Sequence, residues 1–310
     1  MANLGYIQVT RLCNQKCRIC SNPEREATLT LAQAKAMIDD FVARGYDGVI
    51  LTGGEPTMHP QLPDILSYAK SKGIHARLIT NGQRLCDLDL MREYAARGMD
   101  HLHVSIQSPD PKVQDFLTCT EGSLGRALQT LQNAGTLGIN VDVNTPINHY
   151  NASQLDALVR LIVDRFPHVH HFVWNNLDPS MNRAAQNPDV IHRLWEFEVP
   201  LSRAMQFLES TGRTFRAEKV PLCYMAEFAY ASTETRKIVK GEERIVRFLD
   251  EKGMVRETLF QHGKGEACRI CRFDPICAGL YDMDVHYSSK ELFPVFLDPE
   301  PVRRRILSEP

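Results

Sequence analysis

Three cysteines near the start of the chain are the residues whose type and spacing most clearly indicate chemistry. Cys13, Cys17 and Cys20 form the pattern C-x3-C-x2-C directly after an apolar run over 4–12. Cysteine thiolates hold iron–sulfur clusters, and three of them leave the fourth iron of a 4Fe–4S cube open to a small molecule. A structural zinc site would require a fourth cysteine or histidine at short spacing, and the thirty residues after Cys20 contain neither. The pattern favours a three-cysteine 4Fe–4S cluster over a zinc knuckle or three unrelated thiols.

A second motif, Gly53-Gly54-Glu55-Pro56, follows the next strand-like run. A glycine pair allows positive φ angles or close approach of the backbone to another group, and proline fixes the direction in which the chain leaves. Taken alone, the motif is also an ordinary turn between a strand and a helix. Downstream of C-x3-C-x2-C it has a more specific meaning, because together the two motifs resemble those of the radical S-adenosylmethionine (radical SAM) enzymes over roughly residues 4–210.

This resemblance implies that the open iron binds the amino and carboxylate groups of SAM. The reduced cluster then cleaves SAM to a 5′-deoxyadenosyl radical, with electrons from a donor such as flavodoxin or ferredoxin. Gly53, Gly54 and Pro56 are expected at the SAM amino group, where Glu55 positions the ammonium. Ile19 stands where the family usually has an aromatic residue, so it keeps a packing role near adenine without stacking.

The polar ends of the later predicted strands resemble the family's remaining SAM contacts. On this resemblance Thr80 and Asn81 face the ribose, Ser105 and Gln107 hold the carboxylate and ribose, Asn144 contacts the ribose, and Trp174 forms the adenine-side wall. A turn or a polar strand end facing water would give the same residues. Trp174 equally suits the core or a substrate pocket.

A second group of cysteines lies near the C-terminus. Cys268, Cys271 and Cys277 read C-x2-C-x5-C, and Cys223 precedes them. Four soft ligands suit either a second 4Fe–4S cluster or a structural zinc. Similarity to the SPASM or twitch-like extensions of radical SAM enzymes favours one auxiliary cluster. Four cysteine ligands would close that cluster for electron relay, whereas three would leave an iron for substrate binding or sulfur donation.

Other candidate residues carry weaker signals. Cys86 and Cys119 are expected to be small buried apolar groups, although Cys119 is a candidate catalytic thiol that could quench a substrate radical. His101 and His103 alternate along a predicted strand and therefore face one side of it. His168, His170 and His171 flank a strand start without a carboxylate close in sequence, which favours core or surface positions.

Strand-like runs alternate with amphipathic helical stretches along the first two thirds of the chain. The predicted strands are 5–12, 48–52, 76–80, 101–106, 140–145 and 170–175, and the predicted helices are 31–43, 61–71, 87–96, 124–137, 153–165 and 190–210. Six β–α units in a row imply a parallel sheet with right-handed crossovers, either open or closed into a barrel. The family resemblance selects an α/β partial (β/α)6 TIM-like barrel over 1–212, with a cysteine-rich extension over 213–310.

Composition and charge argue against several classes of protein. The 310 residues carry a net charge of −2, so no overall charge directs the chain to nucleic acid. No apolar run reaches 18 residues, which argues against a membrane span. Nine cysteines, an odd number mostly in metal-like spacings, and a start without signal-peptide features predict a reducing cytoplasmic location.

The most specific functional prediction is therefore a radical SAM enzyme in natural-product or small-metabolite chemistry. Only twelve residues precede Cys13, and an N-terminal peptide-recognition domain is therefore not expected, which favours a small-molecule substrate over a short peptide. The competing class is a non-catalytic iron–sulfur carrier or scaffold, or a zinc-stapled binding domain. Neither needs a SAM pocket, so the Gly-Gly-Glu-Pro motif and the polar strand ends argue against both.

Overall fold

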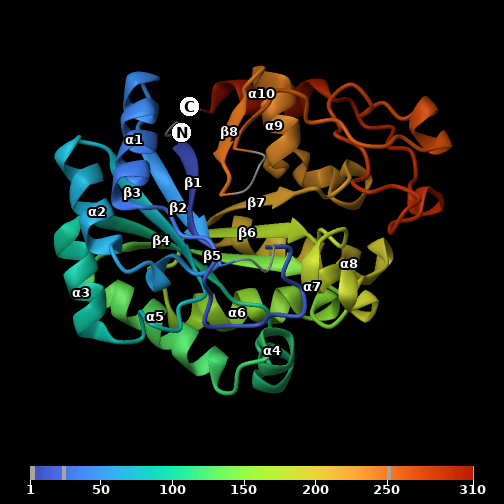
Figure 1. Cartoon of the computed structure of the whole chain (residues 1–310). Coiled ribbons are helices and arrows are strands. Elements are labelled where there is room, and N and C mark those ends of the chain that lie inside the picture. Colours follow the sequence, from blue (N-terminus) through green and yellow to red (C-terminus); the bar gives the residue numbers. More distant parts are fainter. Residues whose placement is uncertain (1–3, 23–25, 250–252, 310) are drawn as a thin grey trace.

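The protein is built on one nine-stranded sheet. The computed structural model describes residues 4–22, 26–249 and 253–309 (Figure 1). The sheet has the order β7-β6-β5-β4-β3-β2-β1-β8-β9, in which all neighbours are parallel except β8 and β9. The strands are β1 (Leu4–Thr10), β2 (Gly48–Gly53), β3 (His75–Thr80), β4 (Met99–Ser105), β5 (Asn140–Ile147), β6 (His171–Asn176), β7 (Thr214–Glu218), β8 (Arg244–Arg247) and β9 (Met254–Glu257).

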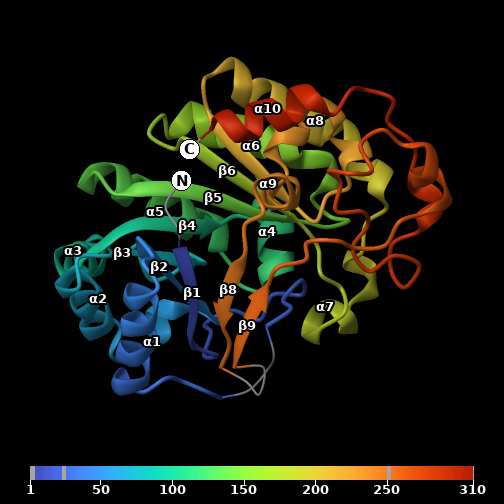
Figure 2. The ribbon, with the colours of Figure 1, turned by 90° about the horizontal axis from the view of Figure 1, so that it is seen from above.

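Helices follow each of the first six strands and lie on one face of the curved sheet (Figures 1 and 2). The main ones are α1 (Leu31–Ala43), α2 (Leu62–Ser71), α3 (Leu88–Arg97), α5 (Ser123–Leu137), α6 (Leu155–Arg165) and α8 (Leu194–Ser210). Shorter helices are α4 (Pro111–Thr118), α7 (Asn182–Gln186), α9 (Thr233–Lys240) and α10 (Glu300–Ser308). Thr30 begins α1 with a capping box, and Asp87 accepts two backbone N–H groups at the start of α3, as expected for N-caps.

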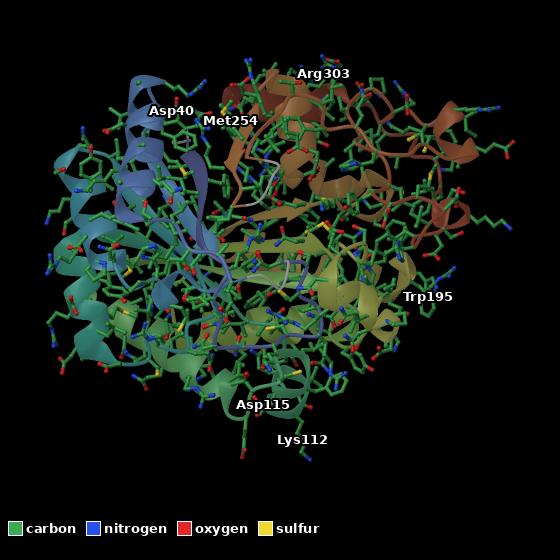
Figure 3. All side chains as sticks on the ribbon, viewed as in Figure 1. Asp40, Lys112, Asp115, Trp195, Met254 and Arg303 are labelled. Carbon is green, nitrogen blue, oxygen red and sulfur yellow. The ribbon has the colours of Figure 1, made fainter. Side chains whose placement is uncertain are left out.

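The two faces of the sheet differ in chemistry. Along β4 the residues Leu102 and Val104 are fully buried and point to the helices, whereas His101, His103 and Ser105 alternate with them on the other, inner face. Burial of one face drives packing of the helices onto the sheet. On the outside of the molecule, charged side chains such as Lys112 extend away from the ribbon, and the apolar Trp195 of α8 is also exposed (Figure 3).

The sheet curls into a partial barrel rather than remaining flat. Strands β7 and β8 are not hydrogen-bonded neighbours in the sheet order, yet Glu218 at the end of β7 forms an ion pair with Arg244 at the start of β8, with N···O 3.2 Å. The sheet therefore curves until these two strands approach each other, and the inner face becomes the interior of a barrel. The partial TIM-like barrel predicted from the sequence is confirmed.

The predicted elements agree with the observed ones to within a few residues, but the extension is more closely joined to the barrel than expected. The predicted helix 31–43 matches α1, while the predicted helix 190–210 starts only at Leu194. The predicted boundary at 212 falls directly before β7, which pairs with β6. Strands β7 and β8 thus extend the barrel sheet from both sides, and a single core includes side chains such as Phe273 and Leu280 from the extension.

None of the helices in the described part of the chain is long and apolar enough to cross a membrane.

Candidate functional site

The first three cysteines lie in the loop that follows the carboxyl end of β1. The Gln15 N–H points to Cys13 Sγ at 3.4 Å, and the Asn22 N–H points to Cys20 Sγ at 3.4 Å. Backbone N–H groups that donate to sulfur stabilise thiolates and are common around iron–sulfur clusters. In parallel barrels the chemistry is located at the carboxyl ends of the strands, and the cysteine loop occupies that end.

The electrostatics of these thiols indicate that they converge. Burial, with smaller contributions from the nearby Cys20 and Cys13 as thiolates, raises the pKa of Cys17 to about 12. Burial likewise raises the pKa of Cys13. Three sulfurs in one place that repel one another as thiolates need a positive centre to become ligands, because metal ions deprotonate the thiols they bind. This donor set fits a 4Fe–4S cluster.

The glycine pair of the second motif is required by close packing of two backbones. A Cβ atom on Gly53, whose φ is +142°, would lie 2.0 Å from the Thr10 carbonyl oxygen, and one on Gly54 would lie 2.3 Å from that of Leu12. The Gly54 N–H donates to the Thr10 carbonyl at 2.7 Å, and the Glu55 N–H to that of Leu12 at 2.8 Å. The motif therefore fixes the chain immediately before Cys13, and only glycine permits this approach.

Glu55 connects the ends of β2 and β3. Its buried carboxylate accepts hydrogen bonds from the hydroxyls of Thr57 and Thr80 at 2.7 and 2.8 Å, and from the Asn81 N–H at 2.7 Å. Burial raises the pKa of Glu55, although these donors oppose the rise. Pro56 starts the short 3-10 helix over 56–58 that Glu55 caps. The predicted contact of Glu55 with the SAM ammonium stays a prediction, and the observed contacts give it a role in loop positioning.

Asn81 brings the end of β3 to the cysteine loop. Its Nδ2 donates to Asn14 Oδ1 at 2.7 Å and lies 3.9 Å from Cys13 Sγ. Thr80 is buried and its hydroxyl donates a hydrogen bond to Glu55, so its role is to hold the Gly-Gly-Glu-Pro loop in position. Of the two residues predicted to face the ribose, Asn81 is the one placed beside the cysteines.

Several amide groups at the same end of the barrel are buried without partners. Gln107 Oε1, Gln15 Nε2 and both amide atoms of Asn176 have no hydrogen-bond partner among the described residues. Buried polar groups are nearly always satisfied, so such atoms indicate room for a polar ligand. Gln107 was predicted as a SAM contact, and Asn176 ends the segment after Trp174 that resembles the family's adenine-side wall. Gln15 was not predicted, since nothing in its sequence context distinguishes it from an ordinary polar residue.

The other predicted polar contacts lie on the inner face of the sheet. Ser105 ends β4 and is partly buried, and Asn144 on β5 accepts a hydrogen bond from Asn175 Nδ2 at 2.5 Å. Both are positioned to face the barrel interior. Their predicted contacts with SAM remain predictions.

The two apolar residues that were predicted to lie near adenine, Ile19 and Trp174, belong to different apolar clusters. Ile19 packs with Leu117 and Leu177 in a small apolar cluster that joins the cysteine loop to segments after β6 and within α4. Trp174 is 2% exposed and belongs to the main core, with its ring centroid 6.1 Å from that of Phe215. It alternates with Asn175 on β6 and so faces the helices. The core position considered for Trp174 is the one observed, and an adenine wall at this residue is not supported.

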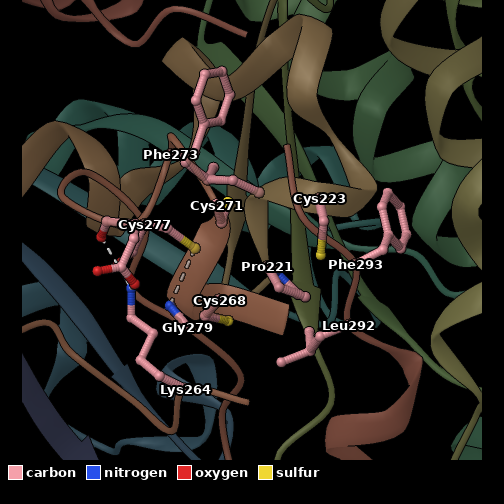
Figure 4. Close-up of a pocket in the computed structure, with 12 residues that line it drawn as sticks. Pro221, Cys223, Lys264, Cys268, Cys271, Phe273, Cys277, Gly279, Leu292 and Phe293 are labelled. Carbon is pink, nitrogen blue, oxygen red and sulfur yellow. Dashed lines mark hydrogen bonds and ion pairs between the residues drawn. The ribbon is translucent and has the colours of Figure 1, made fainter. Parts of the chain in front are cut away.

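The C-terminal cysteines line a single pocket (Figure 4). Cys223 lies in the short helix 222–224 a few residues after the carboxyl end of β7, and Cys268, Cys271 and Cys277 come from the irregular segment that follows β9. Phe273, Leu292 and Phe293 form the apolar part of the wall. All four cysteines predicted as ligands are thus brought together, although Cys223 is 45 residues from the others in sequence.

The environment of these sulfurs also suits metal ligation. The Gly279 N–H points to Cys277 Sγ and the Val295 N–H to Cys271 Sγ, both at 3.3 Å. Burial raises the pKa of Cys223 to about 12 and raises that of Cys277. As at the first group of cysteines, the buried thiols require a positive centre to act as thiolates, so the donor set fits a second cluster and equally a zinc ion.

The remaining cysteines have separate environments. Cys86 Sγ points to the Gln83 carbonyl at 3.2 Å, in keeping with a structural residue. Cys119 is exposed and ends α4 with φ +50°. It is close enough to Cys17 to raise the pKa of that thiol slightly. The structure thus places Cys119 near the first cysteine group and does not bury it as the sequence predicted.

One polar cluster at the ends of β6 and β7 was missed by the sequence reasoning. Lys219, directly after β7, places its Nζ 3.2 Å from Asp178 Oδ2 and 3.8 Å from the ring centroid of Tyr281. The Tyr281 hydroxyl donates to the same Asp178 oxygen at 2.8 Å. Lys219 has φ +58°, and strain of this kind in a non-glycine residue is frequent at functional sites. No sequence signal marks this conformation.

Comparison with known proteins identifies the family. The family model of the radical SAM superfamily matches residues 7–162, about half of the chain. The Fe-coproporphyrin III synthase of Methanosarcina barkeri is 30% identical over 197 residues, which cover 59% of this chain and 49% of that protein. A PqqA peptide cyclase of Methylocella silvestris is 29% identical over 191 residues, 58% of this chain and 50% of that protein. The chain therefore belongs to the radical SAM superfamily and spans about half the length of the curated relatives it matches.

Solved structures share the fold over more of the chain. SuiB of Streptococcus suis bound to S-adenosylmethionine superposes with a TM-score of 0.66 at 14% identity, over 96% of this chain and 77% of SuiB. The anSMEcpe structure with bound AdoMet gives 0.64 at 12% identity, over 89% of both chains. At these identities the likeness shows the fold. The superfamily uses a 4Fe–4S cluster and SAM, so the sequence prediction of family and cofactors is confirmed.

Proposed function

We propose that this radical SAM superfamily member cleaves SAM reductively at a cluster held by Cys13, Cys17 and Cys20, and abstracts hydrogen from a small metabolite or natural-product precursor. The cluster and SAM supply the radical chemistry when bound. The observation that carries the proposal is the convergence of three thiols, one exposed and two partly buried, in a loop fixed by Gly53, Gly54 and Glu55. The chain's own part is to position the loop.

The second cysteine group is proposed to hold an auxiliary 4Fe–4S cluster through Cys223, Cys268, Cys271 and Cys277. All four line one pocket, which supports a closed cluster that relays an electron over an open one that binds substrate. The extension contacts the segment after β6 through Tyr281 and Tyr287, and both the first cysteine group and Cys223 follow carboxyl ends of parallel strands. A substrate bound at this end of the barrel is proposed to lie near both groups.

Lys219, Asp178 and Tyr281 are proposed to contact the substrate in that space. The Lys219 ammonium is 29% exposed and offers a charge-assisted donor to a carboxylate. The Tyr281 hydroxyl and Asp178 add a donor and an acceptor beside it. This set supports a small substrate with a carboxylate. A flavodoxin or ferredoxin is the proposed electron donor, and nine free cysteines support a reducing cytoplasm.

A short peptide is the second candidate substrate. Several relatives are PqqA peptide cyclases, and SuiB has been solved with its precursor peptide SuiA. A carboxylate-bearing side chain of a peptide would suit Lys219 equally. The two candidates differ in size and not in the chemistry at the reacting carbon.

The cleavage reaction is tested with anaerobically reconstituted, reduced enzyme. We expect SAM to yield 5′-deoxyadenosine and methionine, and Cys17→Ala to abolish this, since two thiolates do not hold the cube correctly. Cys86→Ala is the matched control and should cleave SAM at the wild-type rate. Undiminished cleavage by the triple alanine variant of Cys13, Cys17 and Cys20 would refute the proposal.

The substrate class is tested by isotope transfer. An extract from fully deuterated cells is divided into small-metabolite and peptide fractions, and each is supplied to the enzyme with unlabelled SAM. Deuterium in 5′-deoxyadenosine marks a C–D bond that the enzyme has broken. Label from the small-metabolite fraction is expected, and label from the peptide fraction alone would establish the second candidate instead.

A further inference from the structure

A row of polar side chains crosses the barrel interior away from both cysteine groups. His101 and His103 on β4 lie on the inner face of the sheet, and the strand register places Asp142 of β5 opposite His103. The same row continues to His171 of β6, which is opposite Asp142. His101, Asp142 and His171 occupy the first halves of their strands, whereas the first cysteine group and Cys223 follow carboxyl ends of parallel strands.

Three of these side chains direct ligand atoms to one point. Asp142 Oδ2 lies 2.8 Å from His101 Nε2 and 3.1 Å from His103 Nδ1. The three atoms are all within 4.8 Å of one another. The imidazole rings stack with centroids 4.9 Å apart and planes at 15°. The side chains are 15%, 16% and 9% exposed for His101, His103 and Asp142, respectively, so little water competes for them.

Hydrogen bonding does not account for this arrangement. His101 Nε2 is buried and makes no hydrogen bond of acceptable geometry with any described residue, even though Asp142 is 2.8 Å away. His103 Nε2 is also buried without a partner in the described part of the chain. Buried nitrogens are rarely left in this state. Two imidazole nitrogens and a carboxylate oxygen that face a common point are instead typical of metal ligands.

We propose that His101, His103 and Asp142 bind a divalent transition-metal ion, zinc or manganese, inside the barrel. Two imidazoles and one carboxylate suit either ion, with water in the open positions. His171 is not assigned as a ligand, because it is not part of the group of ligand atoms within 4.8 Å of one another, and its Nδ1 pairs with Thr214 Oγ1 at 2.7 Å. The ion would join β4 to β5 at a depth where the sheet lacks an apolar interior, so the role of this site is structural.

A water-filled network is the competing explanation for the same row. Arg77 of β3 is opposite His101, and its Nε is buried without a partner among the described residues. Water molecules could satisfy this group and both histidines. Such a network would bind no metal ion stoichiometrically, which makes the two explanations separable by titration.

The experiment titrates reconstituted holoenzyme with Mn²⁺ under anaerobic conditions and follows free aqueous Mn²⁺ by electron paramagnetic resonance. Manganese prefers oxygen and nitrogen ligands, so the cysteine sites do not interfere. Total zinc and manganese per chain are measured in parallel on the purified wild type and on Asp142→Asn, so that any zinc held by the second cysteine group, which both proteins contain, is subtracted. We expect one bound ion of either metal per chain in the wild type. Asp142→Asn and His103→Ala should weaken binding at least about tenfold, the loss seen even for residues that only support a ligand.

His171→Ala is the matched control, since it alters the same row without removing a proposed ligand, and it should bind the ion as the wild type does. Iron content is checked in every variant to exclude misfolding. A wild-type enzyme that retains neither metal and binds no Mn²⁺ overturns the proposal in favour of the water network. Equal binding by wild type and Asp142→Asn overturns the assignment of these ligands.

Discussion

The Glu218 carboxylate lies 3.2 Å from the Arg244 guanidinium and joins two strands, β7 and β8, that share no backbone hydrogen bonds. Glu218 is the first cause of the raised pKa of Arg244. Glu234, buried beside them, has a pKa raised to about 7 by burial and by Glu218. Arg244 thus offsets two carboxyl groups at the gap between β7 and β8.

Arg244→Met should therefore destabilise the protein. Breaking a buried pair by removing one partner costs about 3–5 kcal/mol, and these side chains are roughly a quarter exposed, so we expect a loss of about 2–4 kcal/mol in the free energy of unfolding. Thermal unfolding of the reconstituted enzyme measures it. Arg256→Met is the control, because Arg256 pairs with Glu243 at an exposed site where the loss should stay below about 1 kcal/mol. Equal losses in both variants would contradict this role.

The first six β–α units could be predicted because their signals are local. Thr30 and Asp87 begin helices, and glycines such as Gly98 and Gly138 end them with positive φ. The strands β7 and β8 could not be found in this way. Both are short, and β8 is defined by pairing with β1, which is more than 200 residues away in sequence. Non-local pairing of this kind leaves no periodic pattern in the segment itself.

Glu55→Gln should impair SAM binding through the loop network. The carboxylate accepts hydrogen bonds from Thr57, Thr80 and Asn81, and an amide would direct its NH₂ group against one of these donors. A charge-assisted contact contributes about 1.5–3 kcal/mol, so we expect SAM affinity to fall by about one to two powers of ten, with iron content unchanged. Equilibrium binding of SAM to the reconstituted variant measures this.

Asp87→Asn provides the control for that experiment. It makes the same carboxylate-to-amide change at an exposed N-cap in the segment after β3, and asparagine caps helices as well as aspartate does. SAM affinity should be unchanged in this variant. An unaltered affinity in Glu55→Gln as well would limit Glu55 to a turn residue without influence on the cofactor.

The candidate site shows where sequence reasoning stops. The cysteine groups were predictable, because the spacing of the cysteines can be read directly from the sequence. The histidines of β4 were recognised as facing one side, but their carboxylate partner Asp142 is brought to them only by the register between β4 and β5. Lys219 and Asp178 likewise meet across two strand ends. Trp174 has an ambiguous signal, since a large apolar residue at a strand end suits a core or a pocket equally.

Cys271→Ala should separate the two metal sites. If each cysteine group holds one 4Fe–4S cluster, the wild type contains about eight irons per chain and the variant about four. SAM cleavage should continue in the variant because it depends on the first group alone. Iron and sulfide analysis and the yield of 5′-deoxyadenosine give both quantities, and Cys86→Ala should retain about eight irons. If the wild type contains zinc in place of the second four irons, the second cysteine group binds a structural zinc ion and not a cluster.

His192 should make the stability of the protein fall in mild acid. It is 1% exposed between the rings of Phe197 and Tyr287, with centroids 5.2 and 5.3 Å away, and neither of its nitrogens has a hydrogen-bond partner among the described residues. Burial, with a smaller effect of His149, lowers the pKa of His192 to about 3. A histidine whose folded pKa lies below its unfolded value stabilises the fold above the unfolded value, near pH 6.5, and this stability is lost as the pH falls toward the folded pKa.

The loss amounts to about 1.4 kcal/mol for each pH unit below about 6.5. His192→Phe keeps the aromatic packing and removes the titration. The drop in melting temperature between pH 7.5 and pH 5.5 should therefore be smaller in this variant than in the wild type, by roughly 2–4 °C. His149→Gln, at an exposed position, should retain the wild-type drop. The same drop in His192→Phe as in the wild type would show that His192 has a partner in solution that relieves its burial.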